Sequence, residues 1–195
     1  MTKKIHRRRK NKSNTSMGFV LGIGLILIGL AAFLLLQGPA NPEEAQTVSR
    51  SVTPVEVNYP APELSLQNVN GETESLIGYR DQVVLVNNWA TWCPPCKAEI
   101  PTLEAYYKAH TADGFVIIGV DAGESQDNVL KFVQGSGMTY PVWVDLNGAA
   151  LDAFNNESLP SSYVIDRNGI VRLAWVGEIN REMLEKYVTP LLTEN

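Results

Sequence analysis

A pair of cysteines, Cys93 and Cys96, most constrains what this chain can fold into and do. They are the only cysteines among its 195 residues, and two prolines separate them. The continuous apolar run before them, residues 83–89, is typical of a buried β-strand, and residues 97–110 are predicted to form a helix. The sequence therefore places a C-x-x-C motif where a strand meets the start of a helix.

This placement favours thiol–disulfide chemistry. The first cysteine would lie at the helix N-terminus, where free N–H groups and the positive end of the helix dipole stabilise a thiolate. The second would lie one turn later, within reach to close or open a disulfide through a mixed-disulfide intermediate. Pro94 and Pro95 fit the first helical turn, because N–H groups there have no partner within the helix.

Three other interpretations of the cysteine pair compete with redox chemistry. A haem-attachment site requires a histidine directly after the second cysteine, where the chain has Lys97. A zinc site needs about four ligands, and the domain adds only His110 to the two cysteines. A purely structural disulfide stays open as an alternative, although so short a loop removes little unfolded-state entropy. Redox chemistry is favoured, and it requires no metal or other cofactor.

The N-terminal part of the chain has the organisation of a membrane anchor. Residues 1–16 contain seven of the 16 basic residues and no acidic one, and residues 17–37 carry no charge. About 20 apolar residues suffice to cross a bilayer as a helix. The basic excess before the apolar run predicts a cytoplasmic N-terminus and an extracytoplasmic domain, periplasmic or on the outer face. A cleaved signal peptide is the alternative, although its apolar core is typically about 7–15 residues.

A linker and a folded domain follow. Residues 38–58 are polar, contain several prolines and lack periodicity, which predicts a flexible linker, and residues 59–195 form the predicted domain. Beyond residue 16 the chain holds nine basic and 21 acidic residues, a net charge of −12. We expect no nucleic-acid partner, because binding to a phosphate backbone requires a basic face.

The pattern of the domain predicts an α/β fold. Asn70-Gly71 and Asn168-Gly169 each separate two strand-like runs and predict two β-hairpins. Buried strands are expected at 83–89, 115–121 and 140–144, and helices at 97–110, 125–134, 149–154 and 182–192. Strands that alternate with helices and end in a hairpin indicate a mixed central sheet flanked by helices.

Two motifs carry a family resemblance, Val86-Asn-Asn-Trp-Ala-Thr-Trp-Cys-Pro-Pro-Cys-Lys97 and Leu159-Pro-Ser-Ser-Tyr-Val-Ile-Asp166. Together they resemble the thioredoxin superfamily, and more closely its membrane-anchored TlpA/ResA-like branch of bacterial thiol–disulfide oxidoreductases, with a redoxin (AhpC/TSA-like) domain. The opening residues 61–66 and Asn70-Gly71 also look like the N-terminal hairpin of that branch. The resemblance covers roughly residues 60–190. It implies a thioredoxin-like fold with an N-terminal β-hairpin, preceded by one transmembrane helix.

The resemblance also implies roles for individual residues. Cys93 resembles the exposed attacking cysteine, and Cys96 resembles the shielded resolving cysteine. Trp92 resembles the aromatic residue that flanks the attacking sulfur. Pro160, preceded by Leu159, resembles the cis-proline that faces the disulfide and pairs with an extended substrate. From the residues alone, Pro160 could equally be a trans turn proline, the more common isomer.

For proton transfer, the chain lacks the residue that thioredoxins use. Thioredoxins carry a buried aspartate for this purpose where the chain has Asn87, and the TlpA/ResA-like branch commonly has asparagine there. Glu99, one turn beyond Cys96, is the candidate for proton transfer. An exposed helical glutamate without a special role is the alternative interpretation.

A disulfide reductase is the function predicted best. The expected substrates are protein disulfides outside the cytoplasm, and apocytochrome c before haem attachment is one client class that the resemblance suggests. The expected electron source is a membrane thiol-transporting reductase, and the domain is expected to be monomeric. A thiol oxidase or isomerase and a non-catalytic module with an inert bridge are alternatives. So is a thiol-dependent peroxidase of the same fold, whose motif would place proline and threonine or serine where Val86 and Ala90 stand.

Overall fold

A mixed eight-stranded sheet forms the centre of the domain in the computed structural model, which describes residues 53–193. The strands follow the order β1-β8-β7-β4-β5-β6-β2-β3 across the sheet. They are β1 (Val55–Pro60), β2 (Ser65–Asn68), β3 (Thr73–Ser75), β4 (Val83–Trp89), β5 (Phe115–Ala122), β6 (Val142–Asp145), β7 (Ser161–Ile165) and β8 (Ile170–Val176). The helical segments are η2 (Leu76–Tyr79), α2 (Pro94–His110), η3 (Thr111–Asp113), α3 (Gln126–Ser136), α4 (Ala149–Ala153), α5 (Arg181–Met183), η4 (Leu184–Val188) and α6 (Thr189–Thr193).

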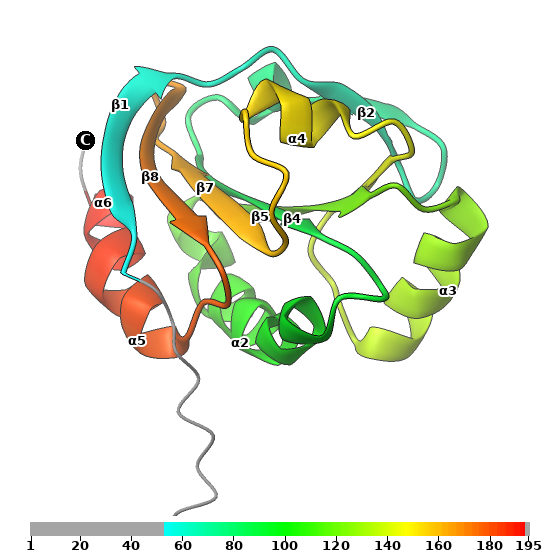
Figure 1. Ribbon diagram of the computed structural model, residues 1–195. Helices are drawn as coiled ribbons and strands as arrows, with labels where there is room; N and C mark the ends of the chain where they lie inside the picture. Colours follow the sequence, from blue (N-terminus) through cyan, green and yellow to red (C-terminus); the bar gives the residue numbers. More distant parts are fainter. Residues whose placement is uncertain (1–52, 194–195) are drawn as a thin grey trace, which may run out of the picture. The chain divides into compact units, whose positions relative to one another are not determined.

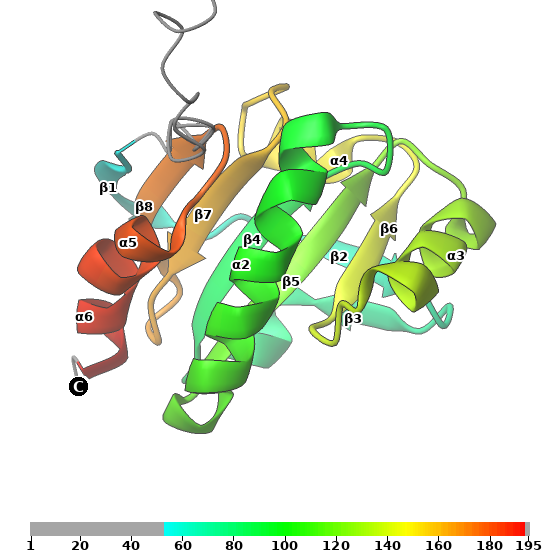
Figure 2. The same cartoon turned by 90° about the horizontal axis from the view of Figure 1, so that it is seen from below.

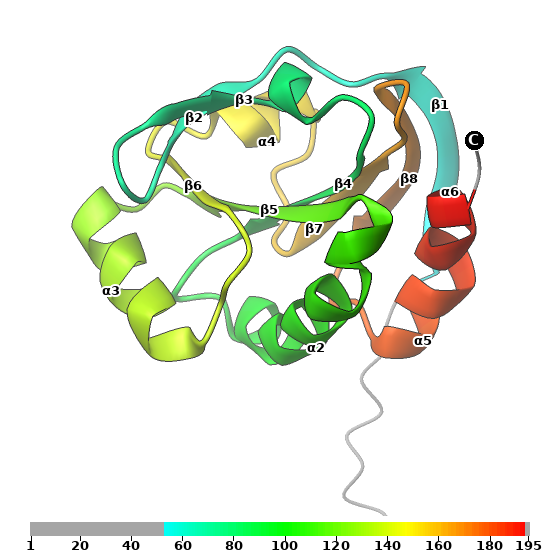
Figure 3. The same cartoon turned by 180° about the vertical axis from the view of Figure 1, so that it is seen from behind.

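Helices cover both faces of this sheet. In Figures 1 and 3, α2, α3, α5 and α6 lie on one face and α4 lies on the other. Figure 2 shows α2 crossing the middle of its face, with α3 on one side and α5–α6 on the other. Each face has its own apolar core: Trp89 and Trp175 belong to one cluster, and Trp143 and Phe154 belong to the other. Because helices cover both faces of the sheet, the central strands are apolar at nearly every position.

The central strand is β4, all seven residues of which are buried. It pairs in parallel with β5 and antiparallel with β7, so the sheet is mixed as predicted. The predicted N-terminal hairpin is confirmed by the antiparallel pairing of β2 with β3. Its turn contains Gly71 at φ +84°, a left-handed conformation that glycine adopts without strain. The thioredoxin-like α/β architecture is therefore confirmed.

The predicted boundary between linker and domain is wrong by four residues. β1 begins at Val55 and pairs antiparallel with β8, whereas residues 55–58 were expected to be linker. β1 is an edge strand, and five of its six residues are exposed. It therefore lacks the apolar periodicity from which the other strands were predicted.

The N-terminal predictions concern a different part of the chain. The expected basic tail (residues 1–16), membrane anchor (17–37) and most of the linker (38–58) lie outside the described residues. Between residues 53 and 193, no helix is long and apolar enough to cross a membrane.

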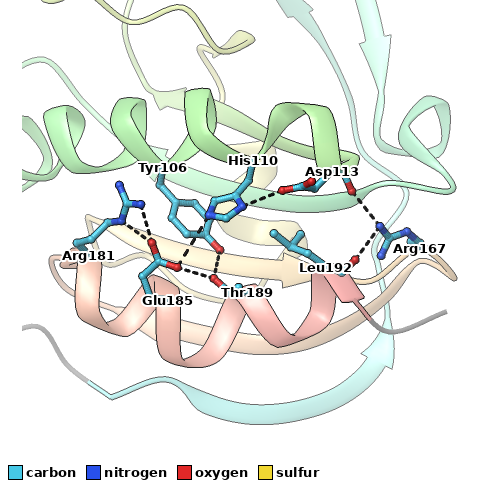
Figure 4. Close-up of polar contacts among 8 residues, drawn as sticks. All are labelled: Tyr106, His110, Asp113, Arg167, Arg181, Glu185, Thr189 and Leu192. Carbon is cyan, nitrogen blue, oxygen red and sulfur yellow. Dashed lines mark hydrogen bonds and ion pairs between the residues drawn. The ribbon is translucent and has the colours of Figure 1, made fainter.

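The C-terminal segment is helical, as predicted, but its middle part, η4, is a π-helix. Polar contacts fasten this segment to α2 (Figure 4). The Tyr106 hydroxyl lies 2.9 Å from Thr189 Oγ1, and His110 Nε2 lies 3.9 Å from Glu185 Oε2. Within the segment, Glu185 also accepts a 2.7 Å hydrogen bond from Arg181 Nε. Within α2, the ring of His110 packs against that of Tyr106 at an interplanar angle of 45°, with centroids 4.4 Å apart.

Arg167, in the turn between β7 and β8, fixes the far end of the same segment. Its guanidinium donates to the carbonyl groups of Leu192 at 3.1 Å and Asp113 at 3.0 Å (Figure 4). It also donates to the carbonyl group of Leu191 at 3.2 Å. A cation that binds the last carbonyls of a helix also interacts favourably with the negative end of the helix dipole. These contacts hold the C-terminal segment in place beside α2 (Figure 2), which carries the cysteine pair.

Candidate active site

Cys93 and Cys96 form a disulfide at the start of α2. Cys93 is the residue that caps the helix, with φ −90° and ψ 108°, and its Sγ accepts a hydrogen bond from the Cys96 N–H at 3.3 Å. Pro94 and Pro95 are the first two helical residues, and both are exposed. The predicted position of the motif at a strand–helix junction is confirmed, and the pair is in its oxidised form.

Access to the disulfide differs from what the resemblance implied. Cys93 was expected to be exposed, but only 3% of its surface is accessible, and Cys96 is fully buried as expected. The disulfide joins the Cys93 sulfur to the shielded Cys96, and that sulfur also accepts the Cys96 N–H. Trp92 is 65% exposed directly beside the pair. Trp92 therefore presents accessible apolar surface next to the disulfide.

The peptide bond between Leu159 and Pro160 is cis, as the resemblance implied. Pro160 directly precedes β7, and its carbonyl accepts a 2.8 Å hydrogen bond from the Gly177 N–H. Ser161 pairs with Asn88, next to the end of β4 that leads to the cysteines. Leu159 packs against the apolar cluster that includes both cysteines. The cis-proline and the disulfide therefore share one end of the sheet.

Glu99 is fully buried on α2, so the alternative interpretation of an exposed glutamate is wrong. Its carboxylate accepts hydrogen bonds from Asn87 Nδ2 at 2.7 Å and from the Ile179 N–H at 2.9 Å. The same Asn87 amide donates to Ser162 Oγ at 3.0 Å. Glu99 is thus joined to β4 and to the loop after β8, and Asn87 joins it indirectly to β7.

The environment of Glu99 changes its acidity. Burial raises the pKa of this carboxyl group to about 7, against the opposing effect of the hydrogen bonds from Ile179 and Asn87. The charge of Glu178 raises the pKa further. A carboxyl group with this pKa can accept or release a proton near neutral pH, which is the requirement for a general base or acid.

Sequence reasoning missed a pair of acidic residues near the motif. Asp121, near the end of β5, is fully buried, and Glu124 follows in the next loop. Glu124 accepts hydrogen bonds from both the N–H and the Oγ1 of Thr91, each at 2.7 Å. The carboxyl ends of neighbouring parallel strands meet at one edge of a sheet. An acid at the end of the second buried strand and another just after it could therefore have been predicted to lie near the loop after β4.

Among the described residues, no group of three or more histidine, cysteine, aspartate or glutamate side chains is arranged to hold a metal ion. The cysteine pair is the redox-active group of the site. A thioredoxin-like fold with a C-x-x-C disulfide at a helix start and a cis-proline at the same end of the sheet defines a thiol–disulfide oxidoreductase.

The chain belongs to the AhpC/TSA family, whose sequence model matches residues 57–174. It is 34% identical over 136 residues to the thiol-disulfide oxidoreductase ResA of Geobacillus kaustophilus, which covers 70% of this chain and 78% of that protein. ResA of Bacillus cereus is 32% identical over 164 residues, 84% of this chain and 90% of that protein. These relatives and the cysteine pair identify the enzyme class as protein disulfide reductase.

Solved structures agree with this assignment. A thiol:disulfide interchange protein of the thioredoxin family from Chlorobium tepidum is 30% identical and superposes with a TM-score of 0.63, covering 71% of this chain and 99% of that chain. StoA from Bacillus subtilis, 24% identical, has the same fold with a TM-score of 0.57, covering 66% of this chain and 97% of that one. The ResA relatives confirm the resemblance to the ResA-like branch, and the solved structures agree with it in fold.

Proposed function

We propose that this chain reduces disulfide bonds of exported proteins outside the cytoplasm, with Cys93 as the attacking and Cys96 as the resolving cysteine. The observation that carries the proposal is the setting of the pair. An exchangeable disulfide starts a helix beside the exposed Trp92, shares its end of the sheet with the cis-Pro160, and has a buried carboxyl group, Glu99, one turn behind it.

The reaction has two steps, and the cysteine pair alone carries the electrons. The Cys93 thiolate attacks one sulfur of the substrate disulfide, a mixed disulfide forms, and the other substrate sulfur leaves as a thiolate that takes up a proton. Cys96 then loses its proton and attacks the Cys93 sulfur, which releases the second substrate thiolate. Two electrons have passed to the substrate, and the chain is left with the Cys93–Cys96 disulfide. No cofactor or metal takes part.

Glu99 is the proposed acceptor of the proton that Cys96 releases. It lies one helical turn beyond Cys96, and its pKa of about 7 allows the ionised form to be present at neutral pH. Asn87 and the Ile179 N–H hold the carboxylate in place. In this assignment, Trp92, Leu159 and Pro160 provide the surface against which an extended substrate binds.

The hydrogen-bond donors at the start of α2 favour reduction of substrate disulfides over their formation. Pro94 and Pro95 have no N–H to offer the Cys93 sulfur, and the N–H of Cys96 is the donor that reaches it, at 3.3 Å. Thiolate stabilisation is therefore moderate. Since a strongly stabilised reduced form makes a strong oxidant, this arrangement favours a reductant over an oxidase or isomerase.

We place the domain outside the cytoplasm, held by a single uncleaved anchor at residues 17–37. The charge asymmetry of the sequence supports this topology. The similarity to the Bacillus cereus ResA spans 164 residues, which is more than the described domain contains, so it extends into the segment before β1. In this position the domain would act as a monomer and be re-reduced by a membrane thiol-transporting reductase.

The reduction potential of the pair tests the proposed direction. We expect a value near that of thioredoxin, about −270 mV, for the full chain in detergent, measured by tryptophan fluorescence in thiol redox buffers. A value near that of a strong oxidant, about −120 mV, would make the chain a disulfide donor and contradict the proposal.

Apocytochrome c is the client class that we propose to test first. The probe is an oxidised Cys-x-x-Cys-His peptide, compared with the same peptide in which alanine replaces histidine. Faster reduction of the histidine peptide supports this client class, and equal rates assign the chain to other exported disulfides. A Cys93→Ser variant is the negative control in both assays.

A further inference from the structure

The loop that leads into the cysteine pair is held by a residue far away in the sequence. Both carboxylate oxygens of Glu124 accept hydrogen bonds from Thr91, Oε2 from the N–H and Oε1 from the hydroxyl, each at 2.7 Å. A carboxylate that accepts two hydrogen bonds from one residue fixes both the position and the orientation of that residue. Glu124 thereby connects the loop after β5 to the loop after β4.

Thr91 lies in the turn that presents the active-site residues. The Cys93 N–H donates to the Ala90 carbonyl at 3.2 Å, which closes the turn over Thr91 and Trp92. Within this turn Trp92 is exposed and Cys93 begins α2. Any change in the backbone at Thr91 would therefore move both the exposed indole and the sulfur of Cys93.

Asp121 supports Glu124 from the interior of the domain. It is fully buried beside Trp89 in the parallel pairing of β4 with β5, and its Oδ1 accepts the Glu124 N–H at 3.2 Å. Its Oδ2 is buried and accepts no hydrogen bond. An unpaired buried oxygen of this kind is costly as part of a charged carboxylate and less costly in a neutral carboxyl group.

We propose that Glu124 is a positioning residue for thiol–disulfide exchange, which holds the turn carrying Trp92 and Cys93 through Thr91, and that Asp121 keeps Glu124 in place. A proton on Asp121 is consistent with this arrangement. Burial raises the pKa of Asp121 to about 8, and the Glu124 carboxylate and the charge of Asp145 act in the same direction. Asp121 is then neutral at pH 7, and the negative charge of the pair lies on Glu124.

The position of that charge has a consequence for the cysteine. A negative charge near a thiol disfavours the thiolate and raises the pKa of the thiol. Glu124, which is bonded to a residue two positions before Cys93, therefore works against thiolate stabilisation at the helix start. This effect complements the loss of N–H donors at the two prolines, and both favour a reductant.

A double-mutant cycle in the full chain tests the proposal. The variants are Thr91→Val, Glu124→Ala and the double variant, and the first readout is kcat/KM for reduction of the oxidised Cys-x-x-Cys-His peptide. We expect kcat/KM to fall by about tenfold in each single variant, because small displacements of the reacting groups slow the reaction. The double variant should lose no more than Glu124→Ala, because the two residues act through one contact.

The second readout separates positioning from a purely structural role. The pH midpoint for alkylation of Cys93 by iodoacetamide should fall by about half a unit or more in Glu124→Ala, because a nearby negative charge is removed. Thr91→Val retains that charge, so its midpoint should stay where it is in the wild type. If Glu124→Ala does not fold, Thr91→Ser decides the matter, since serine restores the hydroxyl and should restore activity that Thr91→Val lacks.

The chain contains a matched control at a second site. Glu104, on α2, accepts the N–H of Thr139 at 2.8 Å and its hydroxyl at 2.6 Å, the same pair of hydrogen bonds in a different loop. Glu104→Ala should leave kcat/KM and the alkylation midpoint within about twofold and a few tenths of a pH unit of the wild type. Additive losses in the cycle, or an equal effect of Glu104→Ala, would overturn the proposal.

The inference rests on the proposed role of Cys93, and the two can fail separately. Mass spectrometry of the alkylated chain identifies the reactive cysteine. If the label lies on Cys96, the assignment of the attacking cysteine is wrong. If it lies on Cys93 and Glu124→Ala behaves as wild type in both readouts, the positioning role of Glu124 is wrong.

Discussion

The side-chain amide of Asn87 donates a 2.7 Å hydrogen bond to the carboxylate of Glu99, from the central strand β4 to the helix α2 that carries the cysteines. Asparagine has no titrating group, so the group that can exchange protons near Cys96, the proposed resolving cysteine, lies on the helix and not on the strand. The amide and the Ile179 N–H stabilise the charged form of Glu99, while burial stabilises the neutral form. This balance puts its pKa in the neutral range.

Removal of the Glu99 carboxylate should change the pH profile of resolution. In the wild type, the rate at which Cys96 resolves a mixed disulfide should rise with pH through about 7, because Glu99 must be ionised to accept a proton. Glu99→Gln should lose this rise and be about 10²-fold slower at neutral pH. Stopped-flow tryptophan fluorescence measures both rates. Glu104→Gln, on the same helix, is the control, and an unchanged profile for Glu99→Gln would remove the assignment.

Stability should fall as the pH rises from about 5 to 8. The folded-state pKa values of Glu99 and Asp121 are raised, to about 7 and about 8, so the native state holds protons that the unfolded state has lost. Their contribution to the free energy of unfolding is fully present below the pKa values of the unfolded state. It is lost as the pH rises through the pKa values of the folded state. The expected slope is on the order of 1 kcal/mol per pH unit for each group while it titrates.

Urea unfolding of the oxidised chain at several pH values measures this slope. Glu74, Glu104 and Glu185 have lowered pKa values, and stability from them is lost only as the pH falls below the range considered. They should therefore contribute little between pH 5 and 8. A free energy of unfolding that is constant or rises across this range contradicts the prediction.

Replacement of Trp92 should affect substrate binding without affecting stability. Its indole is 65% exposed beside the disulfide, so Trp92→Ala removes apolar surface that is available to a substrate. We expect kcat/KM for a peptide disulfide to fall by about tenfold and the free energy of unfolding to change by less than about 0.5 kcal/mol. Ile77, 70% exposed on η2, provides the control, and Ile77→Ala should change neither quantity. Equal losses in the two variants would count against a specific role for Trp92.

A side chain at Gly119 should crowd the core of the domain. A Cβ atom there would lie 3.1 Å from both Trp89 Nε1 and Tyr140 Cε2, in the layer between the sheet and the helices. Gly119→Ala should therefore destabilise the domain by about 1–3 kcal/mol through overpacking. At Gly135, in α3, a Cβ atom would point into open space, with no neighbouring side chain within 4 Å. Gly135→Ala should stabilise the domain by about 0.5–1 kcal/mol, and thermal unfolding compares the two variants.

Local features of the sequence predicted most of the fold. The apolar run of β4, the Asn70-Gly71 turn and the C-x-x-C motif at the start of α2 each contain their own signal within a few residues. The cis isomer of Pro160 required the family resemblance, because the local sequence does not distinguish it from a trans proline. β1 gave no signal, because an exposed edge strand is held by backbone pairing to β8 and not by an apolar pattern.

The sequence by itself determined that a redox-active cysteine pair would lie at a strand–helix junction, because the spacing of the motif and the elements around it are local properties. Only the tertiary structure decided the environment of that pair. Glu99 is buried by contacts with residues 12 and 80 positions away, and Thr91 is held by a glutamate 33 positions away. Burial and hydrogen bonding set acidity and position, and both depend on neighbours that the chain brings together only when it folds.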